Sequence, residues 1–441
     1  ITELITGVDL VEEMLRAAAG LPLSITQETV KINGWATESR VYAEDPLNNF
    51  LPVIGRLNTY REPKHVPGVR IDSGIVEGSE ISIYYDPLIS KLCTWGPTRQ
   101  ESLSRMAEAL DSYVVRGLAR TNVNFLRDLM THPKYISGDI TTKFIEQEFP
   151  QGYKGHVLTE AETVEMFCVS AVTHSLQELH LWHTDGKKAA HAPLSKRWVV
   201  KLGGRAAVVD IQALATDRLG SLPEETYQSF QLSVFPLGKV EDGKDPALPF
   251  KIPQQAALID SLMHSSMGQS DAYYHSKVNA DEVDLNAGLP APIRFRMNIN
   301  PEHTVGPIMS YQLLNLTNET ADPIVRTTQL LASMTYHYNI QFMGSQYNVS
   351  VMTPLQYHLV QHMLPPPVID MTKELQSPMP GVVVGILVKP GDKVKAGAPV
   401  LVLEAMKMRN NLNVVADVTV KEICAKVGDR VDEGQALVLF E

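Results

Sequence analysis

The chain has 441 residues, of which 44% are hydrophobic and 20% charged, and its formal net charge is −11. At roughly 100–200 residues per domain, this length predicts several domains with cores of their own. An acidic chain is a poor match to a nucleic-acid-binding protein. The sequence contains no run of about 18 apolar residues, so no transmembrane helix is predicted. The three cysteines, Cys93, Cys168 and Cys424, lie far apart, which argues for a reducing compartment and against a disulfide framework or a cysteine-based zinc site.

The first part of the chain predicts an α+β unit. Asp9 and Glu12 form a capping-box pattern that opens a helix ending near Gly20. A second helix is expected to open at Thr98 and to run to about Val115. No glycine-rich phosphate-binding loop is found here. Shorter helices are expected at 121–130 and 139–149, and strands at 35–43 and 80–85.

Two charged clusters stand out in this unit. The first runs from Arg40 to Pro46, and the second comprises 69–74 and 83–92. Taken alone, charged side chains on strands and turns are most often surface ion pairs.

The middle of the chain predicts one helix surrounded by antiparallel strands. Thr159 and Glu162 form a capping box, and the apolar run after them predicts a helix to about Asp185, buried on several sides. Together with the strands that follow, it suggests a barrel or a highly curved sheet around the helix. A terminal hairpin is expected to turn at 342–346, and 238–260 is expected to be loop. The strand-like segments are 197–202, 205–211, 231–235, 308–314, 338–342 and 347–352.

Four histidines, His174, His180, His183 and His191, form a loose group in this part of the sequence. A zinc site is conceivable, but surface or interface histidines are favoured because no fourth ligand type and no cysteine lie nearby.

The C-terminal end contains an internal repeat, in which 390–404 aligns with 427–441. Each copy predicts a Gly-Asp turn, a short strand, a second glycine turn and an apolar strand. Because a repeat of this size cannot cover its own apolar face, we expect the two copies to pack face to face. The result would be a small flattened β-barrel over about 373–441.

Lys407 occupies the junction between the two copies. Only the first copy continues, through Ala405 to Met408, before the chain turns back into the second. A solvated surface lysine is the ordinary interpretation. However, methionines flank it at an exposed turn, and the junction is the most protruding point of such a fold. Both features favour a special role for Lys407.

The segment Glu404-Ala405-Met406-Lys407-Met408 resembles the biotin-attachment motif of biotin carboxyl carrier domains, as does 377–381 upstream. The resemblance implies that biotin is joined to Lys407 through an amide. It also implies that Met406 and Met408 are recognised by a biotin protein ligase. A lysine on a protruding turn suits a tethered cofactor that moves between two sites. The alternatives are a lipoyl domain, which usually has Asp before the lysine and Ala after it, and an unmodified lysine.

The two charged clusters, together with 2–10, resemble the C-terminal subdomain of biotin carboxylases over residues 1 to about 155. The resemblance implies that Arg40 contacts the ureido oxygen of biotin. A guanidinium stays protonated and would stabilise negative charge there. Asp86 is expected to orient Arg40. Arg70 matches a position associated with a subunit interface, and a purely structural role is an equal alternative.

The resemblance also implies that the chain starts inside the biotin carboxylase domain. The phosphate loop, ATP-binding lysines, magnesium ligands and catalytic base of the family are expected upstream of Ile1. ATP, Mg²⁺ and bicarbonate are therefore expected as reactants of the longer enzyme.

The family indicated is the alpha chains of biotin-dependent acyl-CoA carboxylases. The expected fold class is α+β with several domains. A partial ATP-grasp-type biotin carboxylase subdomain spans 1–155, and a helix-plus-antiparallel-barrel docking domain, called BT in this family, spans 156–370. A linker at 371–376 leads to a flattened-barrel biotinyl domain at 377–441.

These domains imply a ligase that carboxylates biotin on Lys407 and transfers the carboxyl group to an acyl-CoA. The middle of the chain is too short for a carboxyltransferase barrel of about 250 residues, so transfer is expected on a separate beta subunit. Residues 72–86 look most like members that convert propionyl-CoA to methylmalonyl-CoA. Methylcrotonyl-CoA carboxylases and a lipoyl-type carrier are the alternatives. Neither a nucleic acid nor a membrane is expected as a partner. The family implies the mitochondrial matrix, or the cytoplasm for bacterial members.

Overall fold

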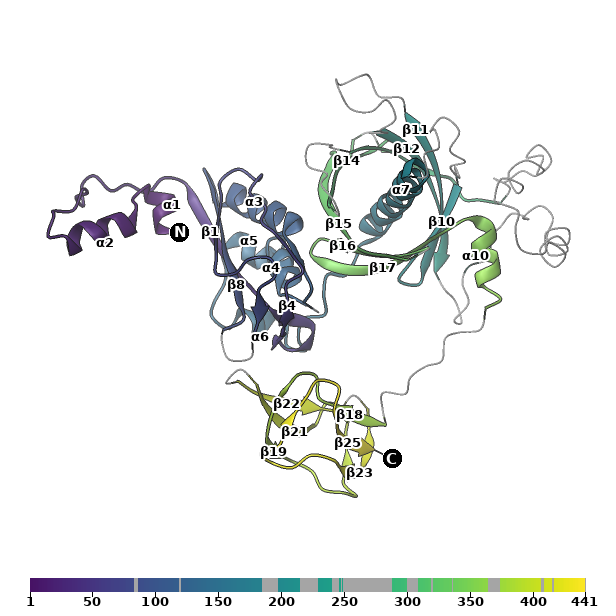
Figure 1. The fold of residues 1–441 in the computed structure, drawn as a ribbon. Helices are drawn as coiled ribbons and strands as arrows, with labels where there is room; N and C mark the ends of the chain where they lie inside the picture. The colour runs from purple at the N-terminus through teal and green to yellow at the C-terminus, as the bar shows by residue number, and fades with distance from the viewer. Residues whose placement is uncertain are drawn as a thin grey trace. The chain divides into compact units, whose positions relative to one another are not determined.

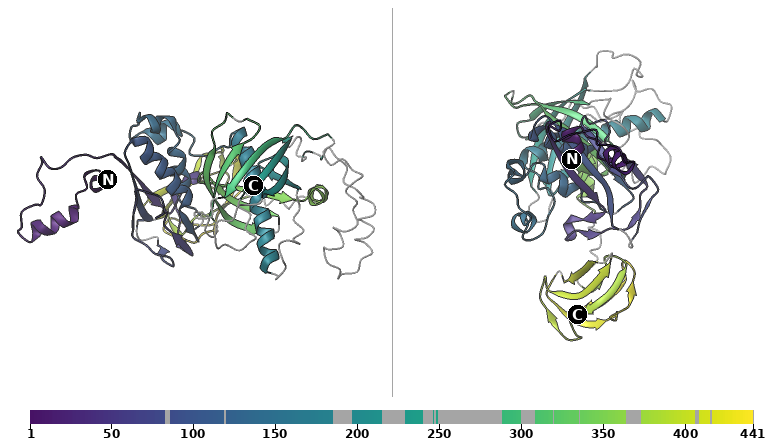
Figure 2. Two further views of the ribbon diagram at one scale, coloured as in Figure 1. Left: turned by 90° about the horizontal axis from the view of Figure 1, so that it is seen from above. Right: turned by 90° about the vertical axis from the view of Figure 1, so that its left-hand side faces the viewer.

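The structure is a computed structural model, in which the chain divides by its internal contacts into residues 157–365 and the two ends. Figures 1 and 2 show its elements, which are described below part by part. The part of the chain that the structure describes comprises 1–82, 86–118, 120–184, 197–214, 229–239, 246, 248, 288–299, 308–318, 320–334, 336–363, 373–405, 408–414 and 416–440.

The N-terminal part is built on a three-stranded sheet. Its central strand β8 (Leu88–Gly96) pairs antiparallel with β1 (Trp35–Tyr42) on one side and with β6 (Val69–Ser73) on the other. Helix α3 (Arg99–Ser112) packs on one face, and the Thr98 hydroxyl caps it by accepting from the amide of Glu101 at 3.2 Å. The shared core contains Val41, Ile89, Leu92, Leu103, Met106 and Leu110.

Short elements complete this part. Helices α1 (Thr2–Thr6) and α2 (Leu10–Ala18) begin it, and the Asp9 side chain accepts from the amides of Val11 and Glu12, each at 3.0 Å. The other elements are β2 (Glu44–Asp45), η1 (Pro46–Asn48), β3 (Leu51–Pro52), β4 (Gly55–Arg56), β5 (Thr59–Arg61), β7 (Glu80–Ile81), β9 (Val114–Arg116), α4 (Val123–Leu129), α5 (Pro133–Ser137) and α6 (Phe144–Glu148).

One expectation for this part was wrong in detail, and another falls partly outside the described residues. The helix expected to reach Val115 ends at Ser112, because Tyr113 is extended and the next residues pair with β5 as β9. The strand expected at 80–85 is described only as β7, since 83–85 lie outside the described residues.

The middle part is a closed eight-stranded antiparallel barrel, sealed where β10 pairs with β17. Helix α7 (Glu160–Thr184) runs through it, as Figure 1 shows. The expected capping box is present, with the Thr159 amide donating to Glu162 at 2.9 Å and the Glu162 amide donating to the Thr159 hydroxyl at 3.2 Å. The strands are β10 (Arg197–Leu202), β11 (Arg205–Leu214), β12 (Ser229–Lys239), β13 (Ile293–Ile299), β14 (Ile308–Asn315), β15 (Ile324–Met334), β16 (His337–Phe342) and β17 (Ser345–Met352), followed by α10 (Pro354–Val360).

The sequence predicted six of these strands and the barrel around the helix, which is confirmed. It missed β13, in which arginines alternate with apolar residues, and β15, which is mostly half-buried or exposed. The predicted hairpin at 342–346 joins β16 to β17, where Met343 and Gly344 take positive φ angles of 48° and 76°. Most of the loop expected at 238–260 lies outside the described residues.

Both polar and apolar side chains hold α7 inside the barrel. The Glu165 side chain is 2% exposed, accepts a hydrogen bond from Tyr311 at 2.7 Å, and pairs with Arg326 at 3.1 Å. Further along the helix, the Ser175 hydroxyl accepts a hydrogen bond from Trp198 Nε1 at 3.0 Å. Because these partners lie on β10, β14 and β15, they hold the helix at several points around the wall.

The C-terminal part is a flattened barrel of two four-stranded sheets. The repeated turns are matched hydrogen bond for hydrogen bond. Asp392 and Asp429 each accept a backbone amide at 2.8 Å, and the amides of Gly391 and Gly428 each donate across to another strand at 2.7 Å. The predicted face-to-face repeat is therefore confirmed. One sheet has the order β18 (Glu374–Gln376), β25 (Ala436–Phe440), β23 (Val418–Ile423), β20 (Lys393–Val394), and the other β22 (Met408–Asn413), β21 (Pro399–Ala405), β19 (Gly381–Ile386), β24 (Arg430–Val431).

We expect Glu165→Leu to destabilise the middle part by about 3 kcal/mol, because it leaves Arg326 and the Tyr311 hydroxyl without their buried partner. Urea unfolding would measure the loss. Glu160→Leu is the matched control, since the Glu160 side chain is 82% exposed and its pair with Arg205 should contribute less than about 1 kcal/mol. Equal losses in the two variants would show that Glu165 does not anchor the helix.

Candidate functional site

The hairpin formed by β21 and β22 carries the lysine singled out by the sequence. Its strands stay in register up to the pair Ala405 and Met408. Lys407 and Met406 lie between these positions, outside the described residues, as does the side chain of Met408. One pair earlier, Glu404 and Arg409 face each other across the strands and form an ion pair at 3.1 Å. The described hairpin is thus held in one register immediately beside Lys407.

The second C-terminal motif, 377–381, approaches this hairpin near its turn. Ser377 is 1% exposed, and its hydroxyl donates to the carbonyl of Met379 at 2.6 Å. At Gly381 a Cβ atom would lie 2.8 Å from the carbonyl oxygen of Glu404. Only glycine therefore lets β19 approach β21 at this point, two residues before the turn.

Arg40 lies on the face of the N-terminal sheet opposite α3. It is directly opposite Lys91 on β8, which in turn is opposite Asp72 on β6. Directly opposed side chains share a face of a sheet, so these charges form a row across three strands. Arg40 pairs with Glu38 at 3.1 Å, and its side chain is 58% exposed. The Glu38 carboxylate raises the pKa of Arg40 above its ordinary value.

Asn122 fixes the strand at Arg40, a role that sequence reasoning missed. The β1–β8 register shifts between Val41 and Tyr42. Next to this irregularity, Asn122 donates from Nδ2 to the Arg40 carbonyl at 3.1 Å, and its Oδ1 accepts from the Tyr42 amide at 2.9 Å. Asn122 is buried, so the two bonds replace part of the interrupted ladder. No sequence signal distinguishes it from an ordinary loop asparagine.

Asp86 is not paired with Arg40 among the described ion pairs. Its carboxylate accepts the amide of Leu88 at 3.0 Å, and Glu38 is the partner of Arg40. Asp86 does act on Glu44, which belongs to the same motif as Arg40. Burial, and then the negative charge of Asp86, raise the pKa of Glu44 to about 7. That Asp86 orients Arg40 stays a prediction, and any such effect must act without direct contact here.

Arg70 lies on the same sheet face and is held by acidic residues. It pairs with Asp72 at 3.0 Å and with Glu3 from α1, and both raise its pKa. Its side chain is 45% exposed, so its guanidinium is ordered but reachable from solvent.

Of the four histidines considered for a zinc site, only His174 has a described side chain. His174 is buried beside Tyr338 and Trp198, and burial lowers its pKa to about 4. His191 and the side chains of His180 and His183 lie outside the described residues. The described residues contain no group of three or more potential metal ligands, and none of their helices is long and apolar enough to cross a membrane.

Comparison with known proteins identifies both ends of the chain. Residues 38–147 match the biotin carboxylase C-terminal domain, and 373–440 match the family described as biotin-requiring enzyme. The whole chain is 36% identical to the human mitochondrial propionyl-CoA carboxylase alpha chain over 442 residues, which is 51% of that protein. The chain is thus similar over its whole length to alpha chains of biotin-dependent acyl-CoA carboxylases.

Two further relatives extend this finding. The chain is 34% identical to the propionyl-CoA carboxylase alpha chain of Ruegeria pomeroyi over 464 residues, covering all of this chain and 56% of that one. Identity falls to 28% over 447 residues with the alpha subunit of Arabidopsis thaliana methylcrotonoyl-CoA carboxylase, covering 99% of this chain and 54% of that one. The chain therefore spans about half the length of these relatives. The predicted resemblance and fold class are confirmed.

We expect Gly381→Ala to destabilise the C-terminal barrel by about 1–3 kcal/mol, because the new methyl group overlaps the Glu404 carbonyl. Hydrogen exchange of the β19 and β21 amides would measure the effect. Gly385→Ala on the same strand is the control, since its Cβ would make ordinary contacts of 3.6 Å or more. Similar exchange in both variants would contradict the close approach at Gly381.

Proposed function

We propose that this chain is the biotin-bearing part of the alpha subunit of an acyl-CoA carboxylase, with biotin attached to Lys407. The observation that carries the proposal is the match of 373–440 to biotin-requiring enzymes, on a barrel whose hairpin register brackets Lys407. Bound biotin would supply a carrier for a carboxyl group between two active sites. The chain's contribution is to present the lysine at the end of an ordered hairpin, where the cofactor can reach both sites.

We propose the same domain limits as the sequence suggests: a biotin carboxylase part at 1–155, a docking domain at 156–370, a linker at 371–376 and a biotinyl domain at 377–441. ATP, Mg²⁺ and bicarbonate would bind mainly to the part of the relatives that this chain does not span. Arg40 would act within 1–155. Its exposed guanidinium lies on a braced strand and could stabilise negative charge on the biotin ureido oxygen.

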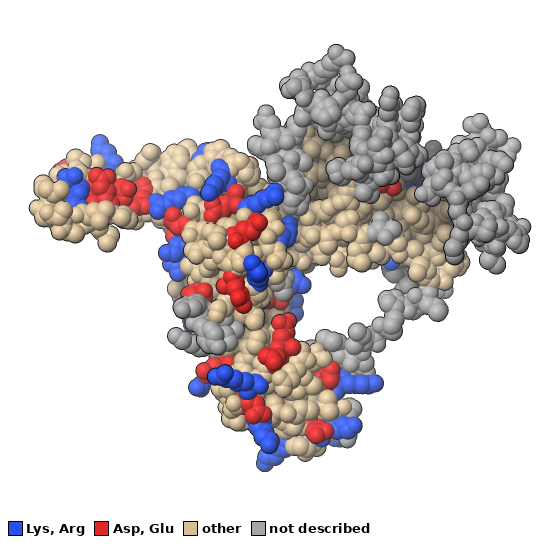
Figure 3. All heavy atoms as spheres, in the orientation of Figure 1, with Lys and Arg blue, Asp and Glu red and all other residues tan. Residues whose placement is uncertain are grey.

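The docking domain would bind a carboxyltransferase beta subunit. The described part of the middle barrel visible in Figure 3 carries few charged side chains, in contrast to the mixed charges over the two ends of the chain. A weakly charged face is compatible with a stable protein interface, whose core is depleted in charged residues. A biotin protein ligase would be the second protein partner, acting at Met406, Lys407 and Met408.

Propionyl-CoA is the acyl substrate that we propose, with methylmalonyl-CoA as product. The support is the higher identity to the propionyl-CoA carboxylase alpha chains than to the methylcrotonoyl-CoA relative, 36% against 28%. Methylcrotonyl-CoA is the second candidate. The human relative is named as mitochondrial, and the name of the Ruegeria pomeroyi relative gives no compartment. We therefore propose the mitochondrial matrix, or the cytoplasm for a bacterial source.

Lys407→Arg should abolish biotinylation, because a guanidinium cannot form the amide that an ε-amine forms. Avidin blotting and intact mass after incubation with a biotin protein ligase would measure it. Lys393→Arg, at an exposed position of the same barrel, is the matched control and should keep the adduct. A biotin adduct on Lys407→Arg would show that Lys407 is not the attachment site. A lipoyl adduct on the wild-type chain would favour the lipoyl alternative.

In the longer enzyme, Arg40→Ala should lower the rate of biotin carboxylation by about 10²–10³-fold, because it removes the group that stabilises developing negative charge. Bicarbonate-dependent ATP cleavage with free biotin would measure the rate, and nucleotide affinity should stay near that of the wild type. Arg56→Ala is the control, since Arg56 is also exposed and its side chain donates to the carbonyl of Gly78 among the described residues. An unchanged rate in Arg40→Ala would remove Arg40 from the reaction.

A further inference from the structure

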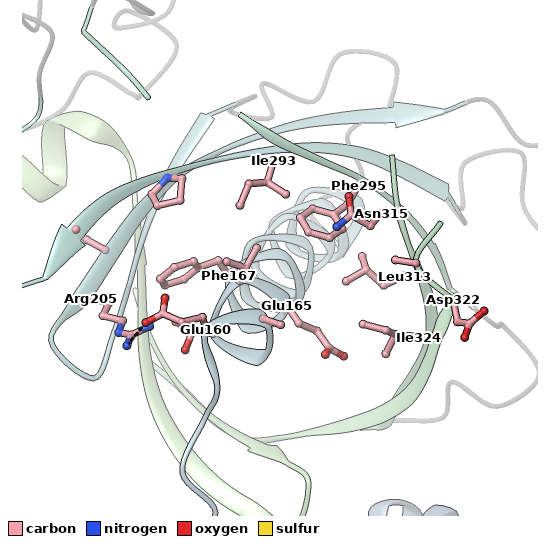
Figure 4. A pocket seen from close by; sticks show the side chains of 17 residues that line it. Glu160, Glu165, Phe167, Arg205, Ile293, Phe295, Leu313, Asn315, Asp322 and Ile324 are labelled. Carbon is pink, nitrogen blue, oxygen red and sulfur yellow. Dashed lines mark ion pairs between the residues drawn. The ribbon is translucent and has the colours of Figure 1, made fainter. Parts of the chain in front are cut away.

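The mouth of the middle barrel contains a cavity of about 550 Å³ at the end where α7 begins. Figure 4 shows it between the first turns of the helix and the surrounding strands. Ligand sites in proteins commonly have volumes of about 300–1,000 Å³. Its apolar lining includes Val164, Phe167, Ile293, Phe295, Leu313 and Ile324, which come from the helix and from three strands.

The cavity belongs to the wall and to the helix together. Phe295 is 6% exposed and Leu313 is 1% exposed, so the side chains around it are already packed on their other sides. Neighbouring strands β13, β14 and β15 are tied by regular antiparallel registers. Packed surroundings of this kind keep the space at the mouth open.

The charges around the cavity are acidic on balance. Glu160, Glu165 and Asp322 line it, against one cation, Arg205. Arg205 is paired with Glu160 at 2.7 Å, as the dashed line in Figure 4 marks. Glu165 is itself held by Arg326 at 3.1 Å. With Arg326 counted, the described groups at the mouth sum to one negative charge, so a cationic ligand is favoured over an anionic one.

The start of α7 does not change this balance. A helix N-terminus attracts anions through its free amides, but Thr159 already accepts from the amide of Glu162. Glu160 and Glu162 lie in the first turn and oppose the positive end of the helix dipole.

From this lining and this charge balance, we propose that the cavity is a binding site for a small apolar molecule whose polar end is neutral or positively charged. The apolar part would fill the space between Phe167 and Ile324, and the polar end would lie beside the carboxylates at the mouth. The proposal goes beyond the proposed function, which places no ligand in residues 157–365, and it does not depend on Lys407.

The test uses the full chain and N-phenyl-1-naphthylamine, an uncharged probe that fluoresces when it enters an apolar site. We expect a saturable rise in fluorescence. Decylamine, protonated at neutral pH, should displace the probe at a concentration at least about tenfold lower than decanoate, a difference of about 1.4 kcal/mol. Absence of saturable binding would overturn the proposal. Displacement by decanoate as readily as by decylamine would overturn its charge preference.

Two variants and one control locate the site. Ile324→Trp fills the cavity from the wall, and Ala321→Trp obstructs its mouth from an exposed position where folding should not suffer. Each should weaken probe binding by at least about tenfold. Val325→Trp is the control, because Val325 is next along β15 but is 71% exposed. Unfolding midpoints are measured for all three. Wild-type binding in Ala321→Trp and Ile324→Trp, or equal weakening in Val325→Trp, would overturn the assignment.

Discussion

Closure of the middle barrel is the constraint on which its helix depends. The pairing of β10 with β17 completes the ring, so every strand has two neighbours and none presents an open edge. A ring of this size encloses a helix of 25 residues only if the helix is apolar on several sides and its few polar groups find partners. Glu165 and Ser175 find them on the wall. The same enclosure leaves the space at the mouth, where the helix begins and its side chains no longer fill the ring.

The sequence predicted what is encoded locally. The capping residues Asp9, Thr98 and Thr159 all cap their helices, since capping depends on residues two or three positions away. The C-terminal repeat was predictable because a duplicated turn needs the same Gly-Asp pair twice, and both copies form the same bonds. Strands set by distant partners were harder. Central strand β8 mixes polar and apolar residues, and its burial follows from the sheet and helix around it.

The candidate sites divide in the same way. Lys407 could be singled out from the sequence because its signal is a short contiguous motif at a symmetric junction, and its role as the attachment site stays a prediction. The surroundings of Arg40 could not be predicted, because they are assembled across strands and loops. Glu38 pairs with the side chain of Arg40, and Asn122 forms a hydrogen bond with its backbone carbonyl. Asp86 instead affects the ionisation of Glu44. Which charged side chains lie near each other depends on the register of the strands, and a single sequence predicts that register only weakly.

The quasi-twofold symmetry of the C-terminal barrel also determines how the domain can be tethered. Its first and last strands, β18 and β25, pair with each other, and Glu374 is opposite Leu439. The twofold symmetry relates the end of the second copy to Glu404, just before the hairpin turn. The two ends of the domain therefore lie at one end of the barrel, and the hairpin turn lies at the opposite end. A circular permutant that joins the two ends and opens at the hairpin should therefore keep the fold while reversing its polarity.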